Sequence, residues 1–205
     1  NCVGIYDNYF SEEFCDNLIE YFEWCAKHNR SYGRPDAERL KNDQSCTINP
    51  GSIVEINYSH PNMADFISEF NTVFWDECYA EYLKKYSVLS DYDQHTIYTY
   101  KIQKTEPTGG YHVWHSEDGS KAYSRRIGVY ILYLNDVEEG GETRFPKINL
   151  NIKPKKGTAM YFKTLMPNGV LLEKSLHQGM PIIRGEKYIV NKWIHLNEFK
   201  NNIYS

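Results

Sequence analysis

The chain has 205 residues, of which 41% are hydrophobic and 24% charged, and its formal net charge is −4. This length and composition are typical of a single globular domain with a sizeable core. A small acidic charge without long runs of one sign argues against nucleic acid and anionic membranes as partners. The apolar runs are far shorter than the roughly 20 residues of a membrane span, and the first residues lack a signal-peptide pattern. We therefore expect a cytoplasmic protein, as a monomer or weak dimer.

Two amphipathic helices are predicted in the N-terminal half. Ser11 followed by two glutamates is a typical helix start, and apolar residues then recur at three- and four-residue spacing up to Cys25. Residues 62–86 repeat this spacing, with a predicted buried side made of Phe66, Phe70, Val73, Phe74, Cys78 and Tyr82. The polar segment 29–52 is interpreted as a long connection, and its residues 30–50 are either a lid that excludes water or a disordered loop.

The cysteines lie at positions 2, 15, 25, 46 and 78. Their odd number and the absence of a C-x-x-C pair argue against a disulfide framework and a zinc ribbon. Reduced thiols are the simplest interpretation.

From residue 95 the sequence period changes to that of short strands. Runs such as "RRIGVYILYLN" and "KYIVNKWIHL" are rich in β-branched and aromatic residues, and Gly, Pro and Asn separate them. Gly140 and Gly141, in "GGET", are expected to provide positive φ between strands. Roughly eight short strands after two helices predict an α+β fold, with the helices packed on one face of a double-sheet barrel. We expect one domain over 1–205, with a helical support region at 1–90 and a β core at 95–200.

The segment "GGYHVWHSEDGS" contains the first candidate site residues. Side chains two apart on a strand point to the same face, so His115 and Glu117 project together. An imidazole and a carboxylate are two thirds of the facial triad that suits non-haem Fe(II). The alternative is a polar strand end, and Asp118 replaces Glu117 as the acid if a bulge reorients the strand.

A third metal ligand has to come from elsewhere, and His177 is the best candidate. Lys187 follows ten residues later, and the intervening Pro181 and Gly185 can reverse the chain. We expect a turn near Ile182 that places His177 and Lys187 side by side on neighbouring antiparallel strands. A lysine near a metal ligand is reasonable if an anionic molecule extends from the metal to the lysine.

The order H-x-E, "YLN", "GGETRFP", H-x-G-x-P-x-x-x-G-x-K and "KWI" resembles the 2-oxoglutarate and Fe(II)-dependent dioxygenases, and within them the prolyl 4-hydroxylase-like branch. The resemblance covers residues 97–196. The sequence departs from the family pattern at two points. The acidic metal ligand of the family is usually aspartate, whereas this chain has Glu117. Many relatives also have a tyrosine on the strand before the metal-binding strand, and here that tyrosine is either absent or displaced to Tyr100 or Tyr111.

The resemblance implies a double-stranded β-helix (jelly-roll) catalytic core in which His115, Glu117 and His177 bind Fe(II). Lys187 and Tyr133 would bind the far carboxylate of 2-oxoglutarate, and Arg144 and Trp193 are weaker candidates for substrate contacts. The implied reaction uses O2 to hydroxylate a peptidyl proline in a protein or peptide substrate, with conversion of 2-oxoglutarate to succinate and with ascorbate as reductant.

Three alternatives stay open at this point. The first is a hydroxylase of another side chain or of a small molecule. The second is a non-catalytic jelly-roll binding module, against which the matched set of five site residues argues. The third is a cupin-like metal enzyme without a cosubstrate, which would not need Lys187.

Overall fold

The computed structural model describes residues 2–33, 41–48, 63–86, 95–96, 99–117, 126–164 and 171–196. Its largest unit is a seven-stranded sheet in which every recorded pairing is antiparallel. The sheet has the order β1-β11-β7-β14-β5-β3, and β4 pairs with the end of β14. The strands are β1 (Val3–Tyr6), β3 (Gln44–Ile48), β4 (His95–Thr96), β5 (Tyr100–Thr105), β7 (Arg126–Tyr133), β11 (Ala159–Lys163) and β14 (Lys187–Leu196).

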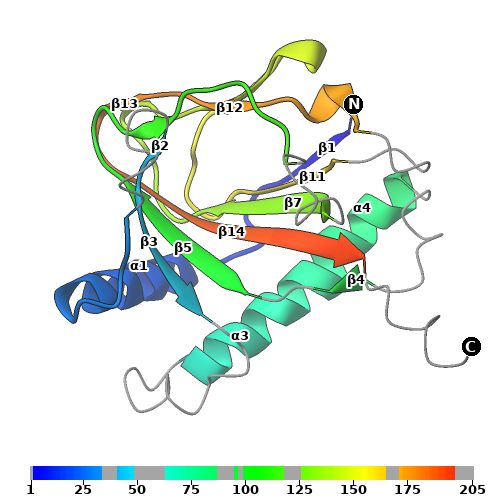
Figure 1. Ribbon diagram of the computed structural model, residues 1–205. Coiled ribbons are helices and arrows are strands. Elements are labelled where there is room, and N and C mark those ends of the chain that lie inside the picture. The colour runs from blue at the N-terminus through cyan, green and yellow to red at the C-terminus, as the bar shows by residue number, and fades with distance from the viewer. Residues whose placement is uncertain are drawn as a thin grey trace, which may run out of the picture.

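Smaller antiparallel sheets lie on one side of this main sheet, above it in the view of Figure 1. A three-stranded sheet has the order β10 (Leu150–Ile152), β9 (Thr143–Phe145) and β12 (Gln178–Gly179). Two further pairs join β13 (Ile182–Arg184) to β8 (Glu139–Gly140), and β2 (Lys41–Asn42) to β6 (Gly110–Tyr111). Two 3₁₀ turns, η6 (Pro146–Ile148) and η7 (Glu173–Ser175), lie among these strands.

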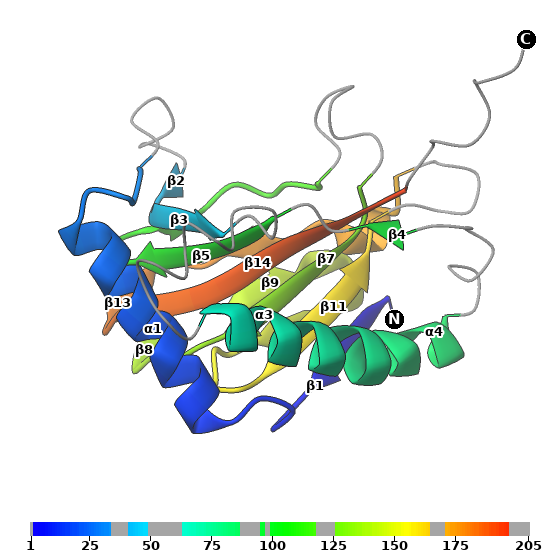
Figure 2. The ribbon, with the colours of Figure 1, turned by 90° about the horizontal axis from the view of Figure 1, so that it is seen from below.

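Helices lie along the opposite side of the main sheet, as Figure 2 shows. Helix α1 (Glu12–Lys27) begins where the sequence predicts, because the Oγ of Ser11 accepts a hydrogen bond of 3.0 Å from the backbone N–H of Phe14. The predicted second helix is a continuous run of α3 (Met63–Asn71), the π-helical η3 (Thr72–Tyr79) and α4 (Ala80–Lys85). Of its predicted apolar side, every residue is buried except Val73, which is partly exposed.

The alternation of side chains along β7 and β14 separates the two faces of the sheet. Tyr130 and Leu132 share one hydrophobic cluster with the helices, whereas Val129 and Ile131 belong to a second cluster on the other face. On β14 the same alternation sends one set of side chains to the face opposite the helices, where they line a cavity: Lys187, Ile189, Asn191 and Trp193. The α+β class with antiparallel sheets is confirmed.

A lysine lies in the hydrophobic core between the main sheet and the helices. Lys192 is 0% exposed, and its Nζ lies 3.4 Å from the ring centroid of Tyr100 and 4.2 Å from that of Phe70. Burial lowers its pKa well below the usual value. Aromatic faces are its nearest partners, and among the described residues its Nζ has no hydrogen-bond partner.

The N-terminal strands β1, β2 and β3 were not predicted. Strand β1 pairs with β11, and β3 pairs with β5 and buries Cys46 and Ile48. The prediction of a connection over 29–52 is therefore wrong for β2 and β3. The lid or disordered-loop alternative falls partly on residues 34–40 and 49–50, which lie outside the described residues.

The positive φ expected at two glycines is confirmed, and the cysteines and the helix lengths can also be described. The five cysteines are buried and free. Gly140 and Gly141 have φ of 82° and 74°, and a Cβ on Gly140 would clash with the carbonyl oxygen of Pro181. In the described ranges, no helix combines the length and hydropathy that a membrane span requires.

Candidate active site

The two predicted histidines lie on adjacent chain segments. His115 and His177 form an antiparallel bridge in which each backbone N–H donates to the other's carbonyl at 3.0 Å. Nδ1 of His115 lies 2.9 Å from the carbonyl oxygen of Val113, and Nδ1 of His177 lies 2.8 Å from that of Ser175. A carbonyl oxygen only accepts, so each Nδ1 is the donor, and each ring in its neutral form has its lone pair on Nε2. Both rings are thus fixed in the tautomer that binds a metal through Nε2.

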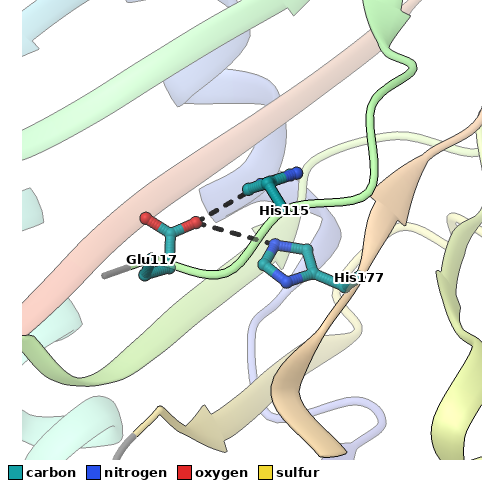
Figure 3. Close-up of side chains that lie close together, drawn as sticks. All are labelled: His115, Glu117 and His177. Atoms are coloured by element: carbon teal, nitrogen blue, oxygen red, sulfur yellow. Dashed lines mark ion pairs between the residues drawn. The ribbon is translucent and has the colours of Figure 1, made fainter. Parts of the chain in front are cut away.

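Glu117 completes the cluster, as Figure 3 shows. Its Oε1 lies 3.5 Å from Nε2 of His115 and 3.6 Å from Nε2 of His177. The ligand atoms of the three residues all lie within 4.8 Å of one another. Two imidazoles and one carboxylate on one side of a cavity are the donor set of non-haem Fe(II) sites. The residues therefore fit an Fe(II) ion.

The second carboxylate oxygen of Glu117 has other partners. Oε2 accepts a hydrogen bond of 2.7 Å from Nε1 of Trp193 and one of 3.2 Å from Nη1 of Arg126. Burial favours the neutral acid, but a hydrogen bond and positive charge from His115 as an imidazolium, the charge of His177 as an imidazolium and the hydrogen bond from Trp193 outweigh it, and they lower the pKa of Glu117 to about 2. An ionised carboxylate is the form that binds a cation.

Lys187 lies in the same cavity, which has a volume of about 300 Å³. The side chain is almost fully buried, and its Nζ donates a hydrogen bond of 2.9 Å to the carbonyl oxygen of Gly141. Burial lowers the pKa of Lys187 to about 8, although the nearby charges of Glu142 and Asp43 oppose this shift. An almost fully buried cation of this kind is suited to binding an anion that enters the cavity.

The spatial relation of His177 to Lys187 differs from the prediction. Both side chains line the cavity, but they are not on neighbouring strands of one hairpin. His177 precedes β12, which pairs with β9, whereas Lys187 begins β14, which pairs with β5 and β7. The segment around Ile182 is a strand paired with β8 instead of a turn, and the chain turns at Gly185, where φ is 90°.

The remaining predicted site residues are divided between the cavity and its surroundings. Trp193 lines the cavity. Tyr133 is buried behind the residues that line the cavity, and its hydroxyl lies 2.7 Å from Oγ1 of Thr143, which does line it. Arg144 is exposed and is not among the residues that line the cavity. Asp118 lies outside the described residues.

Several cavity residues were missed by sequence reasoning. In the sequence, Arg126 looks like the solvated start of a buried strand, yet its guanidinium contacts Glu117 and lies 4.3 Å above the ring centroid of Trp193. Gln103 and Asn191 line the cavity from β5 and β14 and are hydrogen-bonded to each other. The period-two position of Asn191, between Lys187 and Trp193, was the available signal.

Tyr111 also lines the cavity, and its ring centroid lies 3.9 Å from that of His115. Tyr100, in contrast, packs against the helix residues Phe66 and Phe70. Of the two positions considered for a displaced tyrosine, only Tyr111 therefore lies in the cavity.

Comparison with known proteins agrees with this geometry. Residues 97–195 match the family described as the 2OG-Fe(II) oxygenase superfamily. Prolyl 4-hydroxylase 13 of Arabidopsis thaliana is 36% identical over 119 residues, which are 50% of this chain and 43% of that protein. Probable prolyl 4-hydroxylase 9 of the same plant is 26% identical over 92% of this chain and 67% of its own length. The first match thus covers less than half of the relative's length.

Solved structures show a likeness over most of the chain. A viral collagen prolyl hydroxylase from Paramecium Bursaria Chlorella virus-1, solved in complex with 2-oxoglutarate, is 26% identical with a TM-score of 0.70. That match covers 96% of this chain and 97% of the viral chain. A prolyl 4-hydroxylase from Pseudomonas putida, at 14% identity and a TM-score of 0.60, shares the fold over 96% of this chain and 93% of its own. Residues 97–195 therefore belong to the 2OG-Fe(II) oxygenase superfamily, in its prolyl 4-hydroxylase-like branch.

Proposed function

We propose that this chain is an Fe(II)- and 2-oxoglutarate-dependent dioxygenase that hydroxylates peptidyl proline. The observation that carries the proposal is the meeting of two Nε2 atoms and one carboxylate oxygen in a cavity that also contains a buried lysine. Metal-binding histidines and an acid alone would suit many metal enzymes. The buried cation adds the requirement for an anionic molecule beside the metal.

His115, Glu117 and His177 would hold the iron. The hydrogen bonds from Nδ1 of each histidine to a backbone carbonyl keep the rings oriented before the metal binds. Three protein ligands leave coordination positions for a cosubstrate and for O2. The scaffold that carries them would be a double-stranded β-helix with the N-terminal helices on one face, forming a single domain.

Lys187 would bind the far carboxylate of 2-oxoglutarate by a charge-assisted hydrogen bond. Thr143 lines the cavity, and its Oγ1 lies 2.7 Å from the hydroxyl of Tyr133. We therefore place Tyr133 at the carboxylate-binding end, with Thr143 between its hydroxyl and the cavity. A carboxylate here would give the buried ammonium group, which already donates to the Gly141 carbonyl, a negatively charged partner, and this would stabilise its charged form.

When bound, iron, 2-oxoglutarate and O2 supply the oxidising chemistry, in which 2-oxoglutarate becomes succinate and CO2 and one oxygen atom enters a C–H bond. The protein's part is to orient these reactants and to exclude water from the cavity. Ascorbate would keep the iron reduced. Trp193 lines the cavity and would contact the substrate, and Arg144, which is exposed, could do so only outside the cavity.

Proline as the target rests on the relatives. The viral neighbour is a collagen prolyl hydroxylase, and the plant relatives carry the name prolyl 4-hydroxylase. From the activity named for these relatives, we infer that the substrate of the present chain is a proline-containing protein or peptide. A hydroxylase of another side chain or of a small molecule is the second candidate, since the metal and lysine would serve it equally.

The test is hydroxylation of peptides by the Fe(II)-loaded protein with 2-oxoglutarate and ascorbate, read by mass spectrometry. A proline-rich peptide is compared with the same peptide carrying alanine at every proline. We expect one added oxygen on proline only. Succinate formation without any oxygen on either peptide would reject proline as the substrate and leave the second candidate.

A further inference from the structure

The two oxygens of Glu117 face different environments. Oε1 faces the Nε2 atoms of His115 and His177, at 3.5 and 3.6 Å. Oε2 points away from them and accepts hydrogen bonds from Trp193 and Arg126, at 2.7 and 3.2 Å. One oxygen is therefore directed at the metal position and the other is already engaged by the protein.

This division bears on how many coordination positions the acid would occupy. A carboxylate can bind a cation through one oxygen or through both. Binding through both would occupy a position that a bidentate cosubstrate or O2 requires. Glutamate is one methylene longer than the aspartate expected here, so its carboxylate can rotate more freely unless its second oxygen is held.

We propose that Arg126 and Trp193 are positioning residues that hold Oε2 of Glu117, so that the metal is bound through Oε1 alone and the remaining positions stay open. This inference rests on the proposed function, because it concerns the same metal and cosubstrate. Neither residue needs to touch the metal. Each acts through the glutamate.

The surroundings of the two donors make them suitable for this role. The side chains of Arg126 and Glu117 are only 16% and 13% exposed, so their contact is poorly screened by solvent. The guanidinium stacks at 4.3 Å over the Trp193 ring, which fixes both donors relative to each other. Both residues also lie on strands that are paired with each other, β7 and β14, so the backbone sets their separation.

The test uses Trp193→Phe, which removes the Nε1 donor and keeps an aromatic ring under Arg126. Two quantities are measured by calorimetry without turnover: the Mn(II) affinity of the protein, and the 2-oxoglutarate affinity of the Mn(II)-loaded protein. The visible spectrum of the Co(II)-loaded protein, which reports coordination number, is recorded without 2-oxoglutarate. Arg126→Gln is the second variant, and circular dichroism checks that each is folded.

We expect 2-oxoglutarate to bind the folded Trp193→Phe protein roughly tenfold more weakly, with unchanged or tighter Mn(II) binding and a Co(II) spectrum of higher coordination number. In a Glu117→Asp background we expect the shorter acid to lie beyond hydrogen-bond distance of Trp193 Nε1, so adding Trp193→Phe should change the 2-oxoglutarate affinity little.

Unchanged 2-oxoglutarate affinity and Co(II) spectrum in both single variants would overturn the inference. A parallel loss of Mn(II) and 2-oxoglutarate affinity would also overturn it, because the residues would then support metal binding in general. Failure of the unaltered Mn(II) protein to bind 2-oxoglutarate is a different outcome, since it would refute the proposed function itself.

Discussion

Replacing Lys187 by methionine should make the protein more stable and unable to bind 2-oxoglutarate. Burial lowers the pKa of Lys187 from 10.5 to about 8, which corresponds to about 3 kcal/mol at roughly 1.4 kcal/mol per unit. The variant loses the hydrogen bond to the Gly141 carbonyl, worth about 1 kcal/mol. We therefore expect Lys187→Met to raise the free energy of unfolding by about 2 kcal/mol at pH 7 in the absence of ligands.

The stability difference between the Lys187→Met variant and the unaltered protein should depend on pH. Between pH 8 and 10.5 the unfolded chain keeps a proton on Lys187 that the folded protein has released, so the stability of the unaltered protein rises with pH across this window. The advantage of the methionine variant should be complete below pH 8 and absent near pH 10.5.

Urea denaturation of both proteins at pH 7 and at pH 10.5 measures this difference, with the exposed Arg184→Met as a control for loss of a surface charge. Calorimetry on the Mn(II)-loaded variant should show no 2-oxoglutarate binding. A variant that is less stable than the parent at pH 7, or whose gain persists at pH 10.5, would refute the reasoning.

Three further predictions concern the same lysine, the buried Lys192 and the start of α1. The Kd for 2-oxoglutarate, measured by calorimetry, should be constant below pH 8 and rise about tenfold per pH unit above it, because binding then requires protonation of Lys187; a flat profile to pH 9.5 would contradict this. Lys192→Met should raise the free energy of unfolding at pH 7 by about 1–3 kcal/mol, since it removes a buried amine without a hydrogen-bond partner. A lower stability instead would mean that the contact with the Tyr100 ring outweighs burial. Ser11→Ala should cost about 1 kcal/mol and Ser11→Asn little in thermal unfolding, since only the former removes the cap on the Phe14 N–H; equal losses would argue against capping.

Sequence reasoning succeeded where the signal was local and periodic. The Ser11 cap and the apolar spacing predict α1, and glycines with positive φ were expected and found in "GGET". The class of fold followed from the change of period after the second helix. Side chains two apart also brought His115 and Glu117 to one place, although His115 lies in an isolated bridge instead of a long strand.

Sequence reasoning failed where the structure of a segment depends on the strand or side chains that it contacts in the fold. Strand β3 reads as part of a polar connection and becomes a strand through pairing with β5. The chain around Ile182 carries turn signals on both sides, but these do not reveal that it pairs with β8. Arg126 reads as solvated because its partners, Glu117 and Trp193, are brought to it only by the tertiary fold.

The central claim is most directly tested by succinate formation from 2-oxoglutarate by the Fe(II)-reconstituted protein under air. Glu117→Ala and Lys187→Ala are compared with Arg184→Ala, which removes an exposed charge outside the cavity. The account predicts iron-dependent succinate from the unaltered protein and from Arg184→Ala, and loss of most of it in the two cavity variants. Absence of succinate from the unaltered protein, or equal succinate from all variants, would contradict it.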